Sequence, residues 1–381
     1  MPRMETHLAS APVRFFASSH APIDFYFKKC PKDFVVSEEP LYPFSGEGAH
    51  GILHVRKKKQ KAHGRCSLFL ANVLGCPLSA FGYAGLKDKD ALTSQYISLP
   101  KEYLSTLESH AQTLQDHNIK ILDTTCHSHK IRLGHLKGNR FFMRLKKVTP
   151  LNAQKISHVL EFLTQWGFPN YFGAQRFGKW GDNFKQAKLQ TSKKPKKLDR
   201  FLISSYQSWL FNHWLSMRMQ LSTLLDHFSP KEVHSQFEMI PLEQIKALQD
   251  QEHYFKLLEG DVLCHYPFGK YFYHQEGAPN AGRFARQELA PTGLLPGLKV
   301  WRAQGLASHF EALHGPNIQA LGDRRYAVVF PTQLEFCYLE KQAQATLSFF
   351  LPKGSYATTF LEEIAHLELF KRGNDDLPAS D

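Results

Sequence analysis

Apolar and polar residues alternate along four short segments in the first part of the chain. These segments are residues 34–38, 52–56, 93–99 and 140–148. A period of two is typical of strands with one buried face. In the last segment Phe141, Met143 and Leu145 fall on the same face. We therefore predict four strands here.

Helical patterns separate and follow these strands. Residues 66–74 and 102–116 are predicted to be helices, which gives a mixed α+β domain rather than a regular βαβ series. A third helix is predicted over about 152–166, with Gly167 at its C-terminal end and Pro169 beyond it. We place the first domain boundary at this helix.

The chain changes in character after that boundary. A long aromatic-rich helix is predicted over 201–219, and the stretch that follows it is irregular and rich in Gly, Pro and His. Strand-like segments return near 325–350, with a helix at about 356–367. Since these last segments resemble the first domain, we predict that one domain is inserted into another. The expected parts are an N-terminal extension at 1–21 without an assigned role, a discontinuous domain at 22–155 plus 336–371, an inserted domain at 156–335 and a disordered tail at 372–381.

Composition and charge narrow the choice of partner. The chain has 381 residues, 43% of them hydrophobic, which is enough to build sizeable cores. Lys and Arg outnumber Asp and Glu by 47 to 35, and the net charge of +12 favours a polyanion, nucleic acid before anionic membrane. The N-terminus has neither an apolar signal region nor a cleavage site. We expect a cytoplasmic protein that does not bind membrane.

Cysteine usage gives no sign of a disulfide framework or of a metal. The six cysteines lie far apart and form no C-x-x-C pair, so reduced thiols are expected. Cys126, His127 and His129 could donate metal ligands from a loop. A closed site usually needs a second ligand pair at a defined spacing, so solvated histidines are the simpler interpretation and no metal is predicted.

The segment from Gly82 to Thr93 carries the first candidate chemistry. It places Asp88 between Lys87 and Lys89, in a loop just before a predicted strand. Nearby positive charge lowers a carboxyl pKa, and a carboxylate must be ionised to act as a nucleophile. The same residues are also typical of an exposed charged turn, and the residues alone do not separate the two interpretations.

Two further segments have features of nucleic-acid contact. In the first, Asn139, Arg140 and Phe141 follow a glycine; an aromatic ring beside polar groups can stack on an extruded base while those groups bind its edge. A core phenylalanine is an equally good interpretation. The second, residues 167–178, combines glycines with candidate ligand contacts at Asn170, Tyr171, Phe172, Gln175 and Arg176. The alternative interpretation is that this segment packs between two domains and contacts no ligand.

The sequence also contains two basic runs and lacks several common motifs. The runs at 56–61, with Lys57, Lys58 and Lys59, and at 193–197 fit phosphate contacts, although either could be a solvated loop. Residues 46–51 match G-x-G-x-x-G but lead into a predicted strand rather than a helix, so they are no dinucleotide fingerprint. The common ATPase, hydrolase and zinc-protease motifs are absent from the sequence.

Taken together and in order, these segments resemble the TruD family of pseudouridine synthases. The resemblance runs from about residue 24 to residue 367. The matching segments are 28–38 (KKCPKDFVVSE), 46–51, the GLKDKDALTSQ loop, LKGNRFFMRL, GFPNYFGAQRFG, 204–212 (SSYQSWLFN), 258–263 (LEGDVL), 290–297 (APTGLLPG) and 351–363 (LPKGSYATTFLEE).

The resemblance implies a fold, a reaction and roles for particular residues. It implies an α+β protein whose catalytic domain has the pseudouridine-synthase mixed sheet, interrupted by an inserted α+β TRUD domain, with a cleft for tRNA between the two. Asp88 would be the nucleophile, Phe141 would stack on the base with Asn139 beside it, and Lys28 or its neighbour Lys29 would be the basic partner. Lys87 and Lys89 are assigned to electrostatics or phosphate contacts.

The implied reaction isomerises a uridine in tRNA, for this family uridine 13 in the D-arm region, without metal or redox cofactor. Asp88 would attack C1′ of the ribose or C6 of the uracil, and both sites stay open. A monomer is expected. The alternatives are a non-catalytic tRNA-binding protein or folding chaperone on the same fold, and a methyltransferase, for which no Gly-rich cofactor loop follows a strand.

Overall fold

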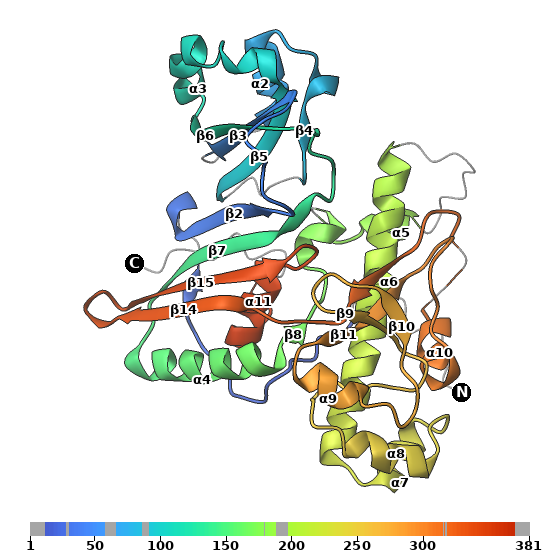
Figure 1. Cartoon of the computed structure of the whole chain (residues 1–381). Helices are drawn as coiled ribbons and strands as arrows, with labels where there is room; N and C mark the ends of the chain where they lie inside the picture. Colours follow the sequence, from blue (N-terminus) through green and yellow to red (C-terminus); the bar gives the residue numbers. More distant parts are fainter. Residues whose placement is uncertain are drawn as a thin grey trace. The chain divides into compact units, whose positions relative to one another are not determined.

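The computed structural model describes residues 12–27, 30–57, 66–85, 91–178, 180–187, 197–314, 316 and 318–369 (Figure 1). The chain forms two compact units. Unit 1 consists of Met1–Ile23, His158–Phe330 and Ser355–Asp381, and unit 2 of Asp24–Ser157 and Pro331–Gly354. Both units are therefore discontinuous in sequence. Their assignment as an inserted and a catalytic domain stays a prediction.

Unit 2 is built on a mixed sheet. Among the described residues it has nine strands, with the order β14-β15-β7-β2-β5-β3-β6, while β1 pairs with β7 and β4 with β5. Strand β2 runs parallel to β5, and the other pairings are antiparallel. In Figure 1, β15, β7 and β2 lie side by side. The strands are β1 (Tyr26–Phe27), β2 (Phe34–Pro40), β3 (His50–Lys57), β4 (Gly82–Tyr83), β5 (Leu92–Pro100), β6 (Ile119–His127), β7 (Leu136–Lys146), β14 (Thr332–Leu339) and β15 (Gln344–Pro352).

The four predicted strands are confirmed as β2, β3, β5 and β7. Phe141, Met143 and Leu145 are all buried, as their alternation in β7 predicted. Helix α2 (Cys66–Leu74) has its predicted bounds and packs Leu70 into a core with Leu53 and other apolar residues of the sheet. Unit 2 also contains the short helices η1 (Pro31–Asp33), η2 (Leu78–Ala80) and η6 (Glu340–Gln342).

The predicted helix at 102–116 is wrong. The segment is broken into η3 (Lys101–Leu104), η4 (Glu108–His110) and α3 (Ala111–Asp116). Its hydroxyl side chains donate to backbone carbonyls three residues back: Ser105 to Glu102 at 3.1 Å, Thr106 to Tyr103 at 2.9 Å and Ser109 to Thr106 at 2.7 Å. Such local bonds compete with a continuous helix, and apolar spacing alone does not reveal them.

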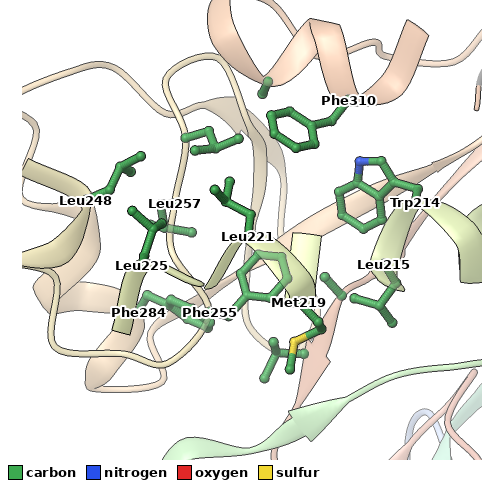
Figure 2. Close-up of a cluster of buried hydrophobic side chains, with 14 of the residues drawn as sticks. Trp214, Leu215, Met219, Leu221, Leu225, Leu248, Phe255, Leu257, Phe284 and Phe310 are labelled. Atoms are coloured by element: carbon green, nitrogen blue, oxygen red, sulfur yellow. The ribbon is translucent and has the colours of Figure 1, made fainter. Parts of the chain in front are cut away.

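Unit 1 is organised around the long helix α6 (Lys197–His227), which extends the predicted helix at both ends. Its buried face contributes Trp214, Leu215, Met219, Leu221 and Leu225 to a core shared with apolar residues of later segments (Figure 2). Helices α7 (Pro230–Gln236) and α8 (Leu242–Gln249) lie at one end of α6 in Figure 1. Residues 207–216 of α6 are all buried, so this part of the helix is enclosed on every side, and tertiary packing accounts for its length.

The stretch after α6 is more regular than predicted. It contains a four-stranded sheet in the order β10-β9-β11-β12, and β13 pairs with β8. The strands after α6 are β9 (Val262–His265), β10 (Tyr271–Tyr273), β11 (Leu289–Leu295), β12 (Asp323–Tyr326) and β13 (Val328–Val329), whereas β8 (Phe168–Pro169) precedes α6. Helices α9 (Asn280–Ala285) and α10 (Gly305–Ala312) also follow α6. Before α6 lie η5 (Ala174–Phe177), α5 (Asn183–Ala187) and α4 (Pro150–Trp166), the last of which confirms the third predicted helix. Elements this short leave little periodicity in a sequence rich in Gly and Pro.

The N-terminal segment has a structural role that the sequence did not indicate. Within unit 1, Arg14 forms an ion pair with Glu362 of α11 (Ala357–Ala365) and donates to the Thr359 carbonyl at 2.8 Å. The Ala17 amide donates to the Glu363 carboxylate at 3.0 Å, and the Ile23 amide to the Ala365 carbonyl at 2.9 Å. The described part of the segment therefore runs along the C-terminal helix and is tied to it.

The described residues also bear on two expectations from the sequence, the absence of membrane contact and the reduced state of the cysteines. None of the helices in the described ranges combines the length and the apolar character that crossing a bilayer requires. The six cysteines are free thiols.

Candidate active site

Strand register places Phe141 in the middle of the sheet of unit 2. Val36 of β2 pairs with Phe141 of β7 on one side and with Thr93 of β5 on the other. Paired residues of neighbouring strands project from the same face. Phe141 of the second motif and Thr93, in the strand that follows the Asp88 segment, therefore project from the same face of the sheet, with Val36 of β2 between them.

Asn139 and Glu38 form the next row on this face. They are register partners across β7 and β2, two residues along from the pair of Phe141 and Val36. Glu38 is only 5% exposed, although it carries a carboxylate. A row of polar residues thus lies beside a row that contains an aromatic residue. Glu38 was not among the site residues predicted from the sequence.

The Phe141 ring belongs to a ladder of aromatic rings on the same face. It is 6% exposed and stacks with Phe349 of β15 at a centroid distance of 5.3 Å and with Phe34 of β2 at 6.3 Å. Phe34 in turn meets Phe27 edge-on at 5.6 Å. Packing in the sheet is therefore observed for Phe141, and stacking on a base stays a prediction.

A buried carboxylate with basic partners lies at the start of β2. Asp33 accepts a hydrogen bond from the Lys146 ammonium at 2.6 Å and from the Cys30 amide at 3.1 Å, and Arg144 approaches it to 3.7 Å. Burial raises the pKa of Asp33, but the hydrogen bonds from Lys146 and Cys30 outweigh that effect and hold the pKa below its ordinary value. The ionised Asp33 thus holds two basic side chains of β7 at this end of the sheet.

The predicted nucleophile lies outside the described residues, together with Lys28, Lys87, Lys89, Lys58 and Lys59. Gly85 and Ala91 are the nearest described residues on either side of Asp88. The following strand, β5, begins at Leu92 beside Val35 of β2, and Thr93 pairs with Lys57 at the end of β3. The described part of this motif therefore leads into the sheet near Asp33 and Lys57.

Arg140 projects from the opposite face of the sheet, because it alternates with Asn139 and Phe141 along β7. Its guanidinium group donates to Glu39 at 3.1 Å and to Gln333. The described structure thus separates Arg140 from the row that contains Asn139. Contact of Arg140 with RNA stays a prediction for that other face.

Three predicted ligand contacts of the third motif are engaged inside unit 1. Asn170 donates to the Tyr326 carbonyl at 3.0 Å and accepts from Arg325 at 2.8 Å. The hydroxyl of Tyr171 accepts from the Phe15 amide at 3.4 Å, and the Arg325 guanidinium lies 3.8 Å from the centroid of the Phe172 ring. These contacts are structural, and contact with RNA stays a prediction for all three residues.

Arg325 was missed by the sequence analysis. It is buried, and burial lowers its pKa to about 9. It donates to the Asn170 carbonyl at 3.0 and 2.9 Å, and so holds the third motif in place. The only sign of this role in the sequence is the pair of arginines in the segment Asp323–Tyr326. Because the sequence does not show what these arginines contact, the segment looks like an ordinary polar strand.

Gln175 and Arg176 are the members of the third motif that lie nearer the surface. Gln175 is exposed, and Arg176 is half-buried. The Arg176 side chain donates to Ser208 at 3.0 Å and to Ser204, both on α6. Its guanidinium group is thereby oriented by the long helix.

The described residues offer no grouping of three His, Cys, Asp or Glu side chains that could hold a metal ion. Cys126 and His127 do not lie in a loop as expected, because they end strand β6. The His127 ring stacks on Tyr42 at 5.2 Å. The G-x-G-x-x-G segment leads into β3, as predicted.

Comparison with known proteins assigns the chain to a family. The family model for tRNA pseudouridine synthase D (TruD) matches residues 12–186 and 181–364. The chain belongs to the TruD family. It is 47% identical to the tRNA pseudouridine synthase D of Wolinella succinogenes over 363 residues, which cover 93% of this chain and 99% of the relative. It is 49% identical to that of Nitratiruptor sp. over 361 residues, again 93% and 99% of the two chains.

A solved TruD structure supports the fold. The crystal structure of a Methanosarcina mazei protein assigned to tRNA pseudouridine synthase D superimposes with a TM-score of 0.64 at 20% identity, covering 96% of this chain and 98% of that one. The predicted family and the α+β fold class with a mixed sheet are thus confirmed.

Proposed function

We propose that this TruD protein isomerises one uridine of a tRNA to pseudouridine, with Asp88 as the nucleophile. The observation that carries the proposal is the similarity over 93% of the chain to proteins named tRNA pseudouridine synthase D. The GLKDKDALTSQ segment with Asp88 lies within the matched residues 12–186. A chain that kept only an RNA-binding role would not need this carboxylate.

The chemistry assigned to Asp88 explains the residues around it. Its carboxylate attacks C1′ of the ribose or C6 of the uracil, and the bond between C1′ and N1 breaks. The freed base turns, C5 bonds to C1′, the bond to Asp88 breaks to restore the carboxylate, and the proton lost from C5 is matched by one gained at N1. Lys28 is proposed as the basic partner that keeps Asp88 ionised, since a nearby positive charge lowers a carboxyl pKa. The residues of this scheme supply a nucleophile and charge, and the proposed reaction uses no cofactor.

The uracil is proposed to leave the RNA stack and to lie against the face that carries Phe141 and Asn139. Extrusion costs a few kcal/mol, which stacking and phosphate contacts offset. The proposed backbone contacts are Lys57, Lys58, Lys59, Lys87, Lys89, Arg140, Gln175 and Arg176. Uridine 13 is the proposed target, and the protein is proposed to act as a cytoplasmic monomer.

Tritium release tests the proposal directly. Purified protein is incubated with tRNA labelled with tritium at uridine C5, without any small molecule, and Asp88→Ala is run beside the wild type. We expect release by the wild type alone, with tRNA binding by the variant within a few-fold, because the carboxylate serves the chemical step. Equal release by the variant would refute the nucleophile, and tight binding without release by either protein would favour the non-catalytic alternative.

A further inference from the structure

A cavity of about 720 Å³ lies in unit 2 at a corner of the mixed sheet. Strand β5 begins there at Leu92, β3 ends there with Arg56 and Lys57, and β6 begins there at Ile119. The register shows that these strand ends meet, because Lys57 pairs with both Thr93 and Ile119. Helix α3, which lies beside β6 in Figure 1, also lines the cavity. We call this space the corner cavity.

Leucine and isoleucine side chains form an apolar wall of the corner cavity. They are Leu92, Leu104, Leu107, Leu114, Ile119 and Ile121. Leu107, Leu114 and Ile119 also belong to the buried core under this part of the sheet, so packing holds the wall in place. A cavity of about 300–1,000 Å³ with an apolar wall and a few polar groups is typical of a ligand site.

Three basic side chains line the same cavity. Lys32, Arg56 and Lys120 are all exposed, and the described lining contains no Asp or Glu. Within the described ranges none of the three forms an ion pair or a side-chain hydrogen bond. Arg56 and Lys120 are register partners on β3 and β6, and like charges directly opposite each other destabilise a sheet. Such an arrangement suits an anionic ligand, which would neutralise them.

The chemistry of the lining fits a nucleotide. Phosphate groups pair with lysine and arginine, and the flat ring of an unpaired base can pack against an apolar wall. The position of the cavity also fits the proposed reaction. Leu92 comes four residues after Asp88, and four residues of extended chain span at most about 14 Å. The corner cavity therefore begins within a few nucleotides of the proposed nucleophile.

We propose that the corner cavity binds an unpaired nucleotide of the tRNA beside the target uridine, with its base on the apolar wall and its phosphates at Lys32, Arg56 and Lys120. The inference rests on the proposed function, from which it takes tRNA as the substrate. A different occupant for this position is an extended peptide paired with β6, which ends the strand order of the sheet. Three cations without an acidic neighbour in the described lining favour RNA over a peptide.

Removing the three charges tests the phosphate contacts. Binding of a tRNA transcript is measured by filter binding at several salt concentrations for the wild type and for the triple variant Lys32→Gln, Arg56→Gln and Lys120→Gln. Each lost contact with a single strand lowers the salt slope by about 0.7, so we expect a slope lower by about two and binding at least about ten-fold weaker at low salt.

A second triple variant is the matched control for charge. Lys101→Gln, Arg132→Gln and Lys341→Gln remove the same charge from exposed positions of unit 2 that do not line the corner cavity. We expect this variant to change the salt slope by less than half as much. Equal losses in the two triple variants would assign the effect to the general charge of the protein and would overturn the inference.

Filling the cavity tests the place of the base. Ala111 of α3 is exposed and lines the corner cavity, so Ala111→Trp adds bulk there without removing a charge or a core side chain. We expect tRNA binding at least about ten-fold weaker, the order that one bound base contributes, with an unchanged salt slope. Thr113→Trp is the matched control, because Thr113 is exposed on the same helix outside the lining, and it should bind tRNA as the wild type does.

Each remaining outcome also decides. If circular dichroism shows that Ala111→Trp does not fold, Gln115→Trp replaces it, since Gln115 is exposed and lines the corner cavity too. Wild-type affinity in the filled variant overturns the inference and is the result expected if a peptide occupies the cavity. A wild type that releases no tritium, together with the expected losses of binding, contradicts the reaction alone. Tritium release together with unchanged binding in the cavity variants contradicts the cavity site alone.

Discussion

Replacing Arg14 by Met should destabilise unit 1 more strongly at alkaline than at acidic pH. Arg14 is the basic partner of two carboxylates of α11: it forms an ion pair with Glu362 and approaches Glu363 to 3.7 Å. The Glu363 side chain is 0% exposed, and its burial raises its pKa from 4.5 to about 7. Methionine fills much of the same space but leaves both carboxylates without this cation.

The magnitude follows from the buried charges. Removing one partner of a buried ion pair costs about 3–5 kcal/mol, because an uncompensated charge remains. Since the folded pKa of Glu363 is raised, its stabilising contribution is complete below pH 4.5 and is lost as pH rises through about 7. This shift corresponds to about 3 kcal/mol. Arg14 lowers the Glu363 pKa, so without Arg14 the loss continues to a higher pH.

The assay is urea unfolding at pH 5.5 and pH 8, followed by tryptophan fluorescence and circular dichroism. At pH 5.5 Glu363 holds a proton in the folded protein, so the variant should lose less stability than at pH 8. The double variant Arg14→Met with Glu363→Gln should remove much of the difference between the two pH values. Arg286→Met is the matched control, because Arg286 pairs with Glu288 at the surface, where such pairs contribute about 0–1 kcal/mol. An equal loss at both pH values would show that Glu363 does not titrate in this contact.

Two further changes probe unit 2. Replacing Lys57, Lys58 and Lys59 with Ala should weaken tRNA binding broadly and reduce the salt slope by about one for each lost phosphate contact, as filter binding at several salt concentrations would show; an unchanged slope clears the run of this role. Asp33→Asn should lower the free energy of unfolding by about 1–3 kcal/mol at pH 7, because Lys146 and Arg144 lose their shared carboxylate. The Asp33 pKa is lowered in the folded protein, so its contribution is present above pH 3.8 and is lost as the pH falls through the lowered folded value; the urea midpoints of the variant and the wild type should therefore converge on acidification below pH 3.8.

The elements that the sequence predicted well have a strong one-sided pattern. Strand β7 alternates buried and partly buried positions from Phe141 to Lys146, and α4 keeps its apolar residues at helical spacing. Strand β6 was missed because it has no such alternation: several consecutive residues near Asp123 and Thr124 are not buried. Local patterning therefore predicts elements that bury one face. It does not predict strands whose conformation is set by the strands with which they pair.

The structural features that the sequence did not predict depend on contacts between segments that are distant in the chain. The N-terminal segment was left without a role because Arg14 finds its carboxylates in residues 348 and 349 positions further along the chain, a pairing that no local pattern contains. The same holds for Arg325 and Asn170, which are 155 residues apart. Buried ion pairs and hydrogen bonds of this kind depend on the fold, so a sequence supplies the residue types but not the partners.

At the candidate site, alternation along a strand and the register between strands give different information about which side chains lie together. Alternation in β7 already separates Asn139 and Phe141 from Arg140, so the division of the second motif between two faces follows from the sequence once the strand is predicted. It does not say that β2 lies between β7 and β5, because that order joins segments far apart in the chain. Only this order makes Glu38 the register partner of Asn139. A glutamate that looks like an ordinary polar position in a strand is therefore placed beside a candidate site residue only by its partner across the sheet.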